Sequence, residues 1–151
     1  MKIYVSSDHA GFDLRQKLVS ALRDRGVNVD DRGPPSPTPV DYPDEAATVA
    51  RRVRDDGDGS RGILVCGSGV GMCMAANKIH GIRAVDAWCT EAARLSRAHN
   101  DANVLCLGAR LIDEVEAMKI VDAWLATPFE GGRHATRVAK LGALDAEEGA
   151  S

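Results

Sequence analysis

Short apolar segments alternate along this chain with longer segments of helical periodicity, and this alternation limits the fold more than any other feature. Strands are expected at residues 2–6, 27–31, 63–66, 82–86 and 104–107, and helices at 12–25, 44–55, 72–78, 91–99, 114–126 and 134–144. Strands that alternate with helices of this length form a parallel sheet covered on both faces. We therefore predict a three-layer α/β/α, Rossmann-like fold with a five-stranded parallel sheet. No linker or repeat divides the chain, so residues 1–151 are expected to form one domain.

The composition is that of a globular protein with no general attraction to polyanions. Hydrophobic residues make up 44% of the chain and charged residues 27%, and the formal net charge is −3. Neither nucleic acid nor a membrane surface is therefore an expected partner. No long apolar span or signal peptide is visible, and the four cysteines have neither CxxC nor zinc-finger spacing. We expect free thiols and a cytoplasmic location.

One strand–loop–helix segment carries the clearest chemical signal. The apolar run 62–65 ends in Cys66, and the glycine-rich loop Gly67-Ser68-Gly69-Val70-Gly71 follows at once. Glycines let a ligand approach the backbone closely, and a helix N-terminus offers unpaired N–H groups to an anion. A cysteine at that position would feel the same positive field, which favours its thiolate. The loop could therefore hold a negative charge and supply a base beside it.

When the loop is considered alone, two less specific interpretations of this segment are also possible. The glycines overlap the dinucleotide-binding pattern G-x-G-x-x-G, but the third glycine comes one residue early, and the loop is in the third strand–helix unit rather than the first. A buried free cysteine also commonly packs as a small apolar side chain without any chemical role.

Polar residues near the ends of other strands extend this predicted site. Ligands of parallel α/β sheets gather at the carboxyl ends of the strands. Asp8 and His9 follow the first strand, and Arg110 follows the fifth. His99 and Asn100 precede the fifth strand. We expect all of these side chains to converge with Cys66 on one edge of the sheet.

The last helical segment contains an arginine pair near its start. Arg133 and Arg137 are four residues apart, so they share one helix face. Positive charge at a helix N-terminus opposes the helix dipole, which suggests an anionic partner such as phosphate. Little of the sheet is left for this terminal helix to cover, and it is expected to pack against a neighbouring subunit. A solvated basic helix face is the alternative.

Taken together, these segments resemble the family of type B ribose-5-phosphate isomerases, which also includes allose- and galactose-6-phosphate isomerases. The matching segments span nearly the whole chain in order: Ser7-Asp8-His9-Ala10-Gly11, Val40-Asp41-Tyr42-Pro43, Cys66 to Gly71, Ala75-Ala76-Asn77-Lys78, Gly81-Ile82-Arg83-Ala84, Ser96-Arg97-Ala98-His99-Asn100, Leu107-Gly108-Ala109-Arg110 and Glu130-Gly131-Gly132-Arg133-His134. Each segment alone is weak, but jointly they are highly specific.

The resemblance implies aldose–ketose isomerisation of a sugar phosphate through an enediolate. It assigns the catalytic base to Cys66 and ring opening to His99, with Ser68 assisting. It assigns the enediolate oxygens to backbone N–H groups of Gly67, Ser68, Gly69, Val70 and Gly71, sugar hydroxyls to Asp8 and Asn100, and phosphate to His9, Arg110, Arg133 and Arg137. The family also implies a homodimer or a dimer of dimers, with sites built from two subunits and the C-terminal helix at the dimer interface.

The glycine loop and the start of the helix after it depart from the commonest family pattern. Ser68 stands where threonine is frequent, and residues 72–74 supply no glutamate that could replace Cys66 as the base. The sequence shows no cluster of metal ligands, and neither a metal nor a cofactor is expected.

Ribose 5-phosphate is the expected substrate. A six-carbon sugar phosphate, or a non-catalytic nucleotide-binding module, is the alternative.

Overall fold

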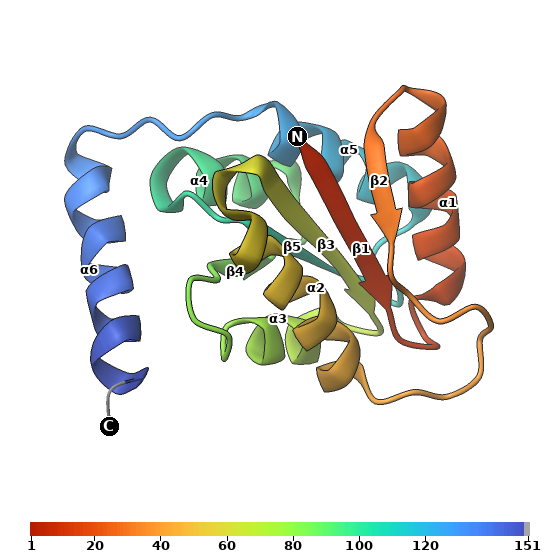
Figure 1. The fold of residues 1–151 in the computed structure, drawn as a ribbon. Helices are drawn as coiled ribbons and strands as arrows, with labels where there is room; N and C mark the ends of the chain where they lie inside the picture. The colour runs from red at the N-terminus through yellow and green to blue at the C-terminus, as the bar shows by residue number, and fades with distance from the viewer. Residues whose placement is uncertain (150–151) are drawn as a thin grey trace.

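The computed structural model describes residues 1–149 and contains the predicted five-stranded parallel sheet (Figure 1). The strands are β1 (Lys2–Ser7), β2 (Asn28–Asp31), β3 (Ser60–Cys66), β4 (Ala84–Asp86) and β5 (Val104–Gly108). Their order across the sheet is β2-β1-β3-β5-β4, and every neighbouring pair is parallel. The expected fold class is thus confirmed, with strand boundaries that differ by up to three residues.

Helices cover both faces of the sheet because side chains of a strand alternate between its two faces. The helices are α1 (Phe12–Asp24), α2 (Tyr42–Asp56), α3 (Val70–Ala76), α4 (Thr90–Asn100), α5 (Glu114–Ala126) and α6 (Arg133–Gly149), with a short 3₁₀ turn at Gly57–Gly59. Ile3, Ile63 and Leu105 pack with α1, α4 and α5 on one face. Tyr4 and Leu64 pack with α2 and α3 on the other.

Several helix ends differ from the sequence-based expectation, and local contacts explain the start of α2 and the end of α6. Helix α2 begins at Tyr42 after Asp41, not at Asp44, because Pro43 fits the first turn of a helix, where no N–H partner is needed. Helix α6 continues to Gly149, beyond the expected end at residue 144. Asp145 accepts hydrogen bonds from His80 and from the Gly81 amide, which ties the end of α6 to the rest of the chain. Residues 150–151 lie outside the described part.

The reversal of strand order between β1 and β3 positions the site. From β1 the chain moves outward to β2, whereas from β3 it moves to β4 and β5 on the other side. The helices that follow, α1 and α3, consequently lie on opposite faces of the sheet. In open parallel sheets this arrangement opens a crevice between the carboxyl ends of the two strands. The Asp8 turn and the Cys66 loop both lie at this crevice.

Helix α6 stands apart from the sheet and from the hydrophobic cores on its two faces (Figure 1). None of its residues is buried, and Leu141 and Leu144 remain 47% and 56% exposed. An amphipathic helix of this length gains most of its stability by burying its apolar face, which the described residues do not do for α6. Among residues 1–149, no helix is long and apolar enough to span a membrane.

Candidate active site

Cys66 ends β3, and the loop that follows turns back over its sulfur. The thiol is 4% exposed, and its Sγ accepts a hydrogen bond from the Gly69 amide at 3.2 Å. Gly69 has a φ of 81°, a left-handed conformation that favours glycine. The loop backbone therefore directs an N–H group at the Cys66 sulfur.

Glycines in and around this loop are required by close packing. A Cβ at Gly71 would lie 2.7 Å from the Tyr42 ring, and one at Gly108 would lie 2.6 Å from the Ser68 carbonyl oxygen. The Ala109 amide also donates to the Cys66 carbonyl at 2.8 Å. Strand β5 thus fixes the position of the loop, so that its backbone presents a preformed surface at the crevice.

Asp86 lies beneath the loop with an unpaired carboxylate oxygen. A Cβ at Gly69 would clash with its Oδ1, which is buried and has no hydrogen-bond partner in the described chain. Burial raises the pKa of this carboxyl above its ordinary value, since desolvation disfavours the charged form. Asp86 was not among the predicted site residues, and its position as the last residue of β4 was the only sequence signal for it.

The first turn brings Asp8 and His9 to the same edge as Cys66. The Asp8 amide donates to the Val65 carbonyl at 3.2 Å, and its Oδ1 accepts from the Gly11 amide at 3.0 Å. Nδ1 of His9 accepts from the Val40 amide at 3.4 Å. Asp8 therefore stabilises the turn that leads into α1, and it also lies beside the end of β3.

Arg110 meets the glycine loop from the other side. Its amide donates to the Gly67 carbonyl at 3.0 Å, and its guanidinium borders the position that a Cβ on Gly67 would occupy, at 3.2 Å. The residue is exposed. The structure thus brings five predicted site features to one edge of the sheet: Asp8, His9, Cys66, the glycine loop and Arg110.

His99 and Asn100 lie at the opposite edge, and the expectation that they share an edge with Cys66 within one chain is wrong. They end α4, which runs antiparallel to the strands and finishes just before Val104, the first residue of β5. Cys66 pairs instead with Gly108, the last residue of β5. A strand of this length separates the two edges by on the order of 15 Å. Arg133 at the start of α6 lies on the side of His99 rather than of Cys66.

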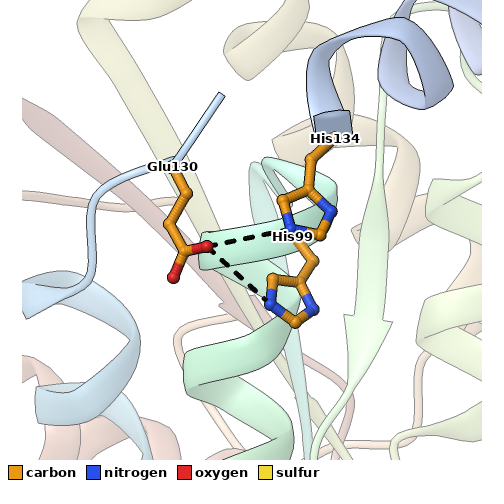
Figure 2. Close-up of side chains that lie close together, drawn as sticks. All are labelled: His99, Glu130 and His134. Atoms are coloured by element: carbon orange, nitrogen blue, oxygen red, sulfur yellow. Dashed lines mark ion pairs between the residues drawn. The ribbon is translucent and has the colours of Figure 1, made fainter. Parts of the chain in front are cut away.

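At this second location three side chains form a compact group (Figure 2). The rings of His99 and His134 stack with centroids 4.1 Å apart. One oxygen of Glu130 lies 3.9 Å from Nε2 of His99 and 3.7 Å from Nε2 of His134. Burial lowers the pKa of His134, and the neighbouring His99 and Arg133 side chains lower it further.

Several of these neighbours were not predicted as site residues. Tyr42, Glu130 and His134 appear in the matching segments, but no role was assigned to them. Glu130 and His134 are four residues apart, but Glu130 lies before the first turn of α6, so helical periodicity does not predict their contact. The sequence analysis expected no cluster of metal ligands. It did not anticipate that His99 would lie beside Glu130 and His134, because His99 is far from these two residues in the sequence.

The geometry defines a parallel α/β protein with a thiol and a glycine loop at its topological switch point. A sequence model of the Ribose/Galactose Isomerase family matches residues 3–141, and the chain belongs to that family. The resemblance drawn from the sequence motifs is thereby confirmed.

Individual relatives match over almost their full length. The "Ribose-5-phosphate isomerase B" of Escherichia coli K12 is 48% identical, covering 95% of this chain and 96% of its own. The "D-erythrulose-4-phosphate isomerase" of Pectobacterium atrosepticum is 41% identical, over 98% and 97%. The structure of Mycoplasma genitalium ribose-5-phosphate isomerase B with bound ribulose 5-phosphate superposes with a TM-score of 0.94 at 43% identity, over 97% of each chain.

Proposed function

We propose that this chain interconverts ribose 5-phosphate and ribulose 5-phosphate through an enediolate, with Cys66 as the base. The observation that carries the proposal is the thiol at the switch point, with the Gly69 amide donating to its Sγ at 3.2 Å. The family membership and the sugar phosphate in the Mycoplasma genitalium structure support the substrate class. Reaction in the cytoplasm is part of the proposal, and the free state of all four cysteines supports it.

The chemistry requires moving one proton between neighbouring carbons. The Cys66 thiolate takes the proton from C2 of the open-chain aldose, and the electrons pass to the carbonyl oxygen at C1. The proton of the C2 hydroxyl then passes to the oxygen at C1, and the Cys66 thiol returns its proton to C1 as the C2 carbonyl forms, which gives the ketose. A C–H beside a carbonyl is a weak acid, so stabilising the oxyanion lowers the barrier most. One well-placed donor supplies roughly 3 kcal/mol. Backbone N–H groups of the Gly67–Gly71 loop are the proposed donors.

The remaining roles are distributed between the two edges of the sheet. Beside Cys66, Asp8 binds a sugar hydroxyl, His9 and Arg110 contact the phosphate, and Ser68 assists the base. His99 opens the sugar ring, Asn100 binds a hydroxyl, and Arg133 with Arg137 holds the phosphate.

This division implies a site shared between two subunits. Because His99 and Cys66 are on opposite edges, one chain cannot place both on one small sugar. A second copy in a homodimer, or in a dimer of dimers, supplies the missing half. The exposed Leu141 and Leu144 of α6 support this arrangement, since contact with another subunit would bury them.

The number of carbon atoms in the preferred sugar phosphate is to be settled by experiment. Four- and six-carbon sugar phosphates use the same enediolate chemistry, and the relative named for erythrulose 4-phosphate favours testing a shorter substrate. Turnover of ribose 5-phosphate, allose 6-phosphate and erythrose 4-phosphate should therefore be compared on the same preparation.

Replacing Cys66 tests the proposal most directly. Cys66→Ala should reduce kcat by at least a thousandfold while substrate still binds, because it removes the base but leaves the backbone donors. Cys89→Ala is the matched control, since this exposed thiol is the N-cap of α4 and accepts a hydrogen bond from the Ala92 amide rather than from the glycine loop. Steady-state kinetics with ribose 5-phosphate, together with calorimetric binding, measures both effects. A kcat within tenfold of wild type in Cys66→Ala would overturn the assignment, and absence of turnover in the wild type would favour a binding module.

A further inference from the structure

Glu130 and His134, which take no part in the proposed isomerisation, form a compact group of potential metal ligands with His99. The three side chains come from the end of α4, the segment between α5 and α6, and the first turn of α6. One ligand atom from each lies within 4.8 Å of those of the other two. Two imidazoles and one carboxylate are a donor set that zinc uses in proteins.

The distances require only small side-chain movements to bind an ion. Ligand atoms 2.0–2.2 Å from a tetrahedral zinc are separated by about 3.3–3.5 Å from one another. The two nitrogen–oxygen distances to Glu130 are 3.9 and 3.7 Å. A contraction of about half an ångström, with rotation of the stacked rings so that both nitrogens face the ion, reaches that geometry. Glu130 is 53% exposed and His99 35%, so an ion can enter from solvent and keep a water as its fourth ligand.

Backbone hydrogen bonds hold the three residues together without relying on the side chains. The Glu130 amide donates to the carbonyl of Ala98, the neighbour of His99, at 3.0 Å. The His134 amide donates to the Gly131 carbonyl at 3.0 Å. Ordering the ligands before the ion arrives lowers the entropic cost of binding. This pre-organisation distinguishes the group from a chance meeting of surface side chains.

The surrounding charge selects the kind of ion. Arg94 lies within electrostatic reach of Glu130, and Arg133 and Arg137 lie within reach of His134. These cations oppose an ion held by charge alone, such as Mg²⁺, which also prefers oxygen ligands. An ion that bonds strongly to imidazole nitrogen, such as Zn²⁺, gains enough from the two histidines to compete.

We propose that His99, Glu130 and His134 bind a divalent transition-metal ion of the zinc class, and that the bound ion inhibits the enzyme. The inhibitory part rests on the proposed function of His99. An imidazole nitrogen that bonds the ion cannot exchange a proton with the sugar ring oxygen. Zinc should therefore block ring opening while leaving the proton transfer at Cys66 intact.

Binding is tested first, without reference to turnover. Chelator-treated Cys66→Ala protein, which lacks the competing thiol at the loop, is titrated with Zn²⁺ by calorimetry and with Co²⁺ by visible absorption. Glu130→Gln and His134→Ala should each weaken zinc binding by about tenfold or more. His80→Asn is the matched control, because His80 contacts the Asp145 carboxylate at 3.0 Å but lies outside the group. Its zinc affinity should equal that of the parent, and Mg²⁺ should give no binding heat.

Two results would overturn the metal site: unchanged zinc affinity in Glu130→Gln and His134→Ala, or no tetrahedral cobalt spectrum. Inhibition is then measured on the enzyme with Cys66 intact. Zinc should slow turnover of ribose 5-phosphate more than that of erythrose 4-phosphate, which is too short to close the same ring, and Glu130→Gln should relieve this effect. Equal inhibition of both substrates, with binding confirmed, would overturn the block at ring opening while the metal site stands.

Discussion

At the scale of single residues, the burial of the Asp86 carboxyl against the glycine loop is energetically unfavourable. Its Oδ1 is buried against Gly69 without a hydrogen-bond partner. An unpaired buried oxygen of a carboxylate is unfavourable, and burial accordingly raises the pKa of this group. The absence of a Cβ at Gly69 is what allows the carboxyl to come so close to the loop.

The raised pKa of Asp86 predicts a pH-dependent effect of neutralising it. The folded state binds the proton more tightly than the unfolded chain, so the contribution of Asp86 to stability is present below its unfolded pKa and is lost as pH rises through the folded pKa. Asp86→Asn should therefore raise the unfolding midpoint relative to wild type at pH 7, and the difference should shrink toward pH 3. Thermal unfolding followed by circular dichroism across this range measures the difference.

A suitable control for this effect is Asp58→Asn, because Asp58 is exposed in the short 3₁₀ turn. It should give no comparable pH-dependent difference. A midpoint difference between Asp86→Asn and wild type that stays constant from pH 3 to pH 7 would contradict the role given to burial.

At the scale of elements, α6 carries charge and apolar surface that its own chain does not use. Arg133 and Arg137 are exposed, and the Arg137 guanidinium donates a hydrogen bond to the Arg133 carbonyl of the same helix at 3.1 Å. The helix is connected to the rest of the chain through Asp145 and through the contacts of His134. These features are consistent with the proposal that the arginines of α6 contribute to a site shared with another subunit.

Removing one arginine of this pair should weaken substrate binding more than it slows the chemistry. A guanidinium–phosphate contact is worth roughly 1.5–3 kcal/mol. Arg137→Ala should therefore raise KM by about one to two powers of ten, with a smaller effect on kcat. Steady-state kinetics measures both constants. Lys140→Ala, an exposed cation on the same helix, should leave KM near wild type, and an equal rise in both variants would indicate a non-specific charge effect.

At the scale of the whole molecule, the proposed active site is divided between the two edges of the sheet. Cys66 and Asp8 occupy the carboxyl edge, and His99 lies at the amino edge beside the start of α6. The strands hold these edges apart in every copy of the chain. The proposed roles of Cys66 and His99 in one reaction therefore require at least two subunits.

Mixing two inactive variants tests this dependence. Cys66→Ala chains and chains carrying both Arg133→Ala and Arg137→Ala should each have little activity, whereas a mixed dimer regains one complete site. Random assortment should restore about a quarter of the wild-type activity, because half of the dimers are mixed and each has one good site. The mixture is refolded together, and mixed dimers are verified by a tag on one chain. Mixed dimers without activity would show that the arginines serve their own subunit.

Sequence patterns were enough to predict the parallel sheet, the two helical layers and the position of Cys66 at the end of a strand. These features follow from hydrophobic periodicity and glycine placement, which act over short stretches of chain. Which edge of the sheet each side chain reaches depends instead on tertiary packing. His99 belongs to the edge opposite Cys66 because α4 returns antiparallel to the strands, and it meets Glu130 because the chain after α5 passes beside Ala98. Such contacts join residues far apart in sequence, and no local pattern encodes them.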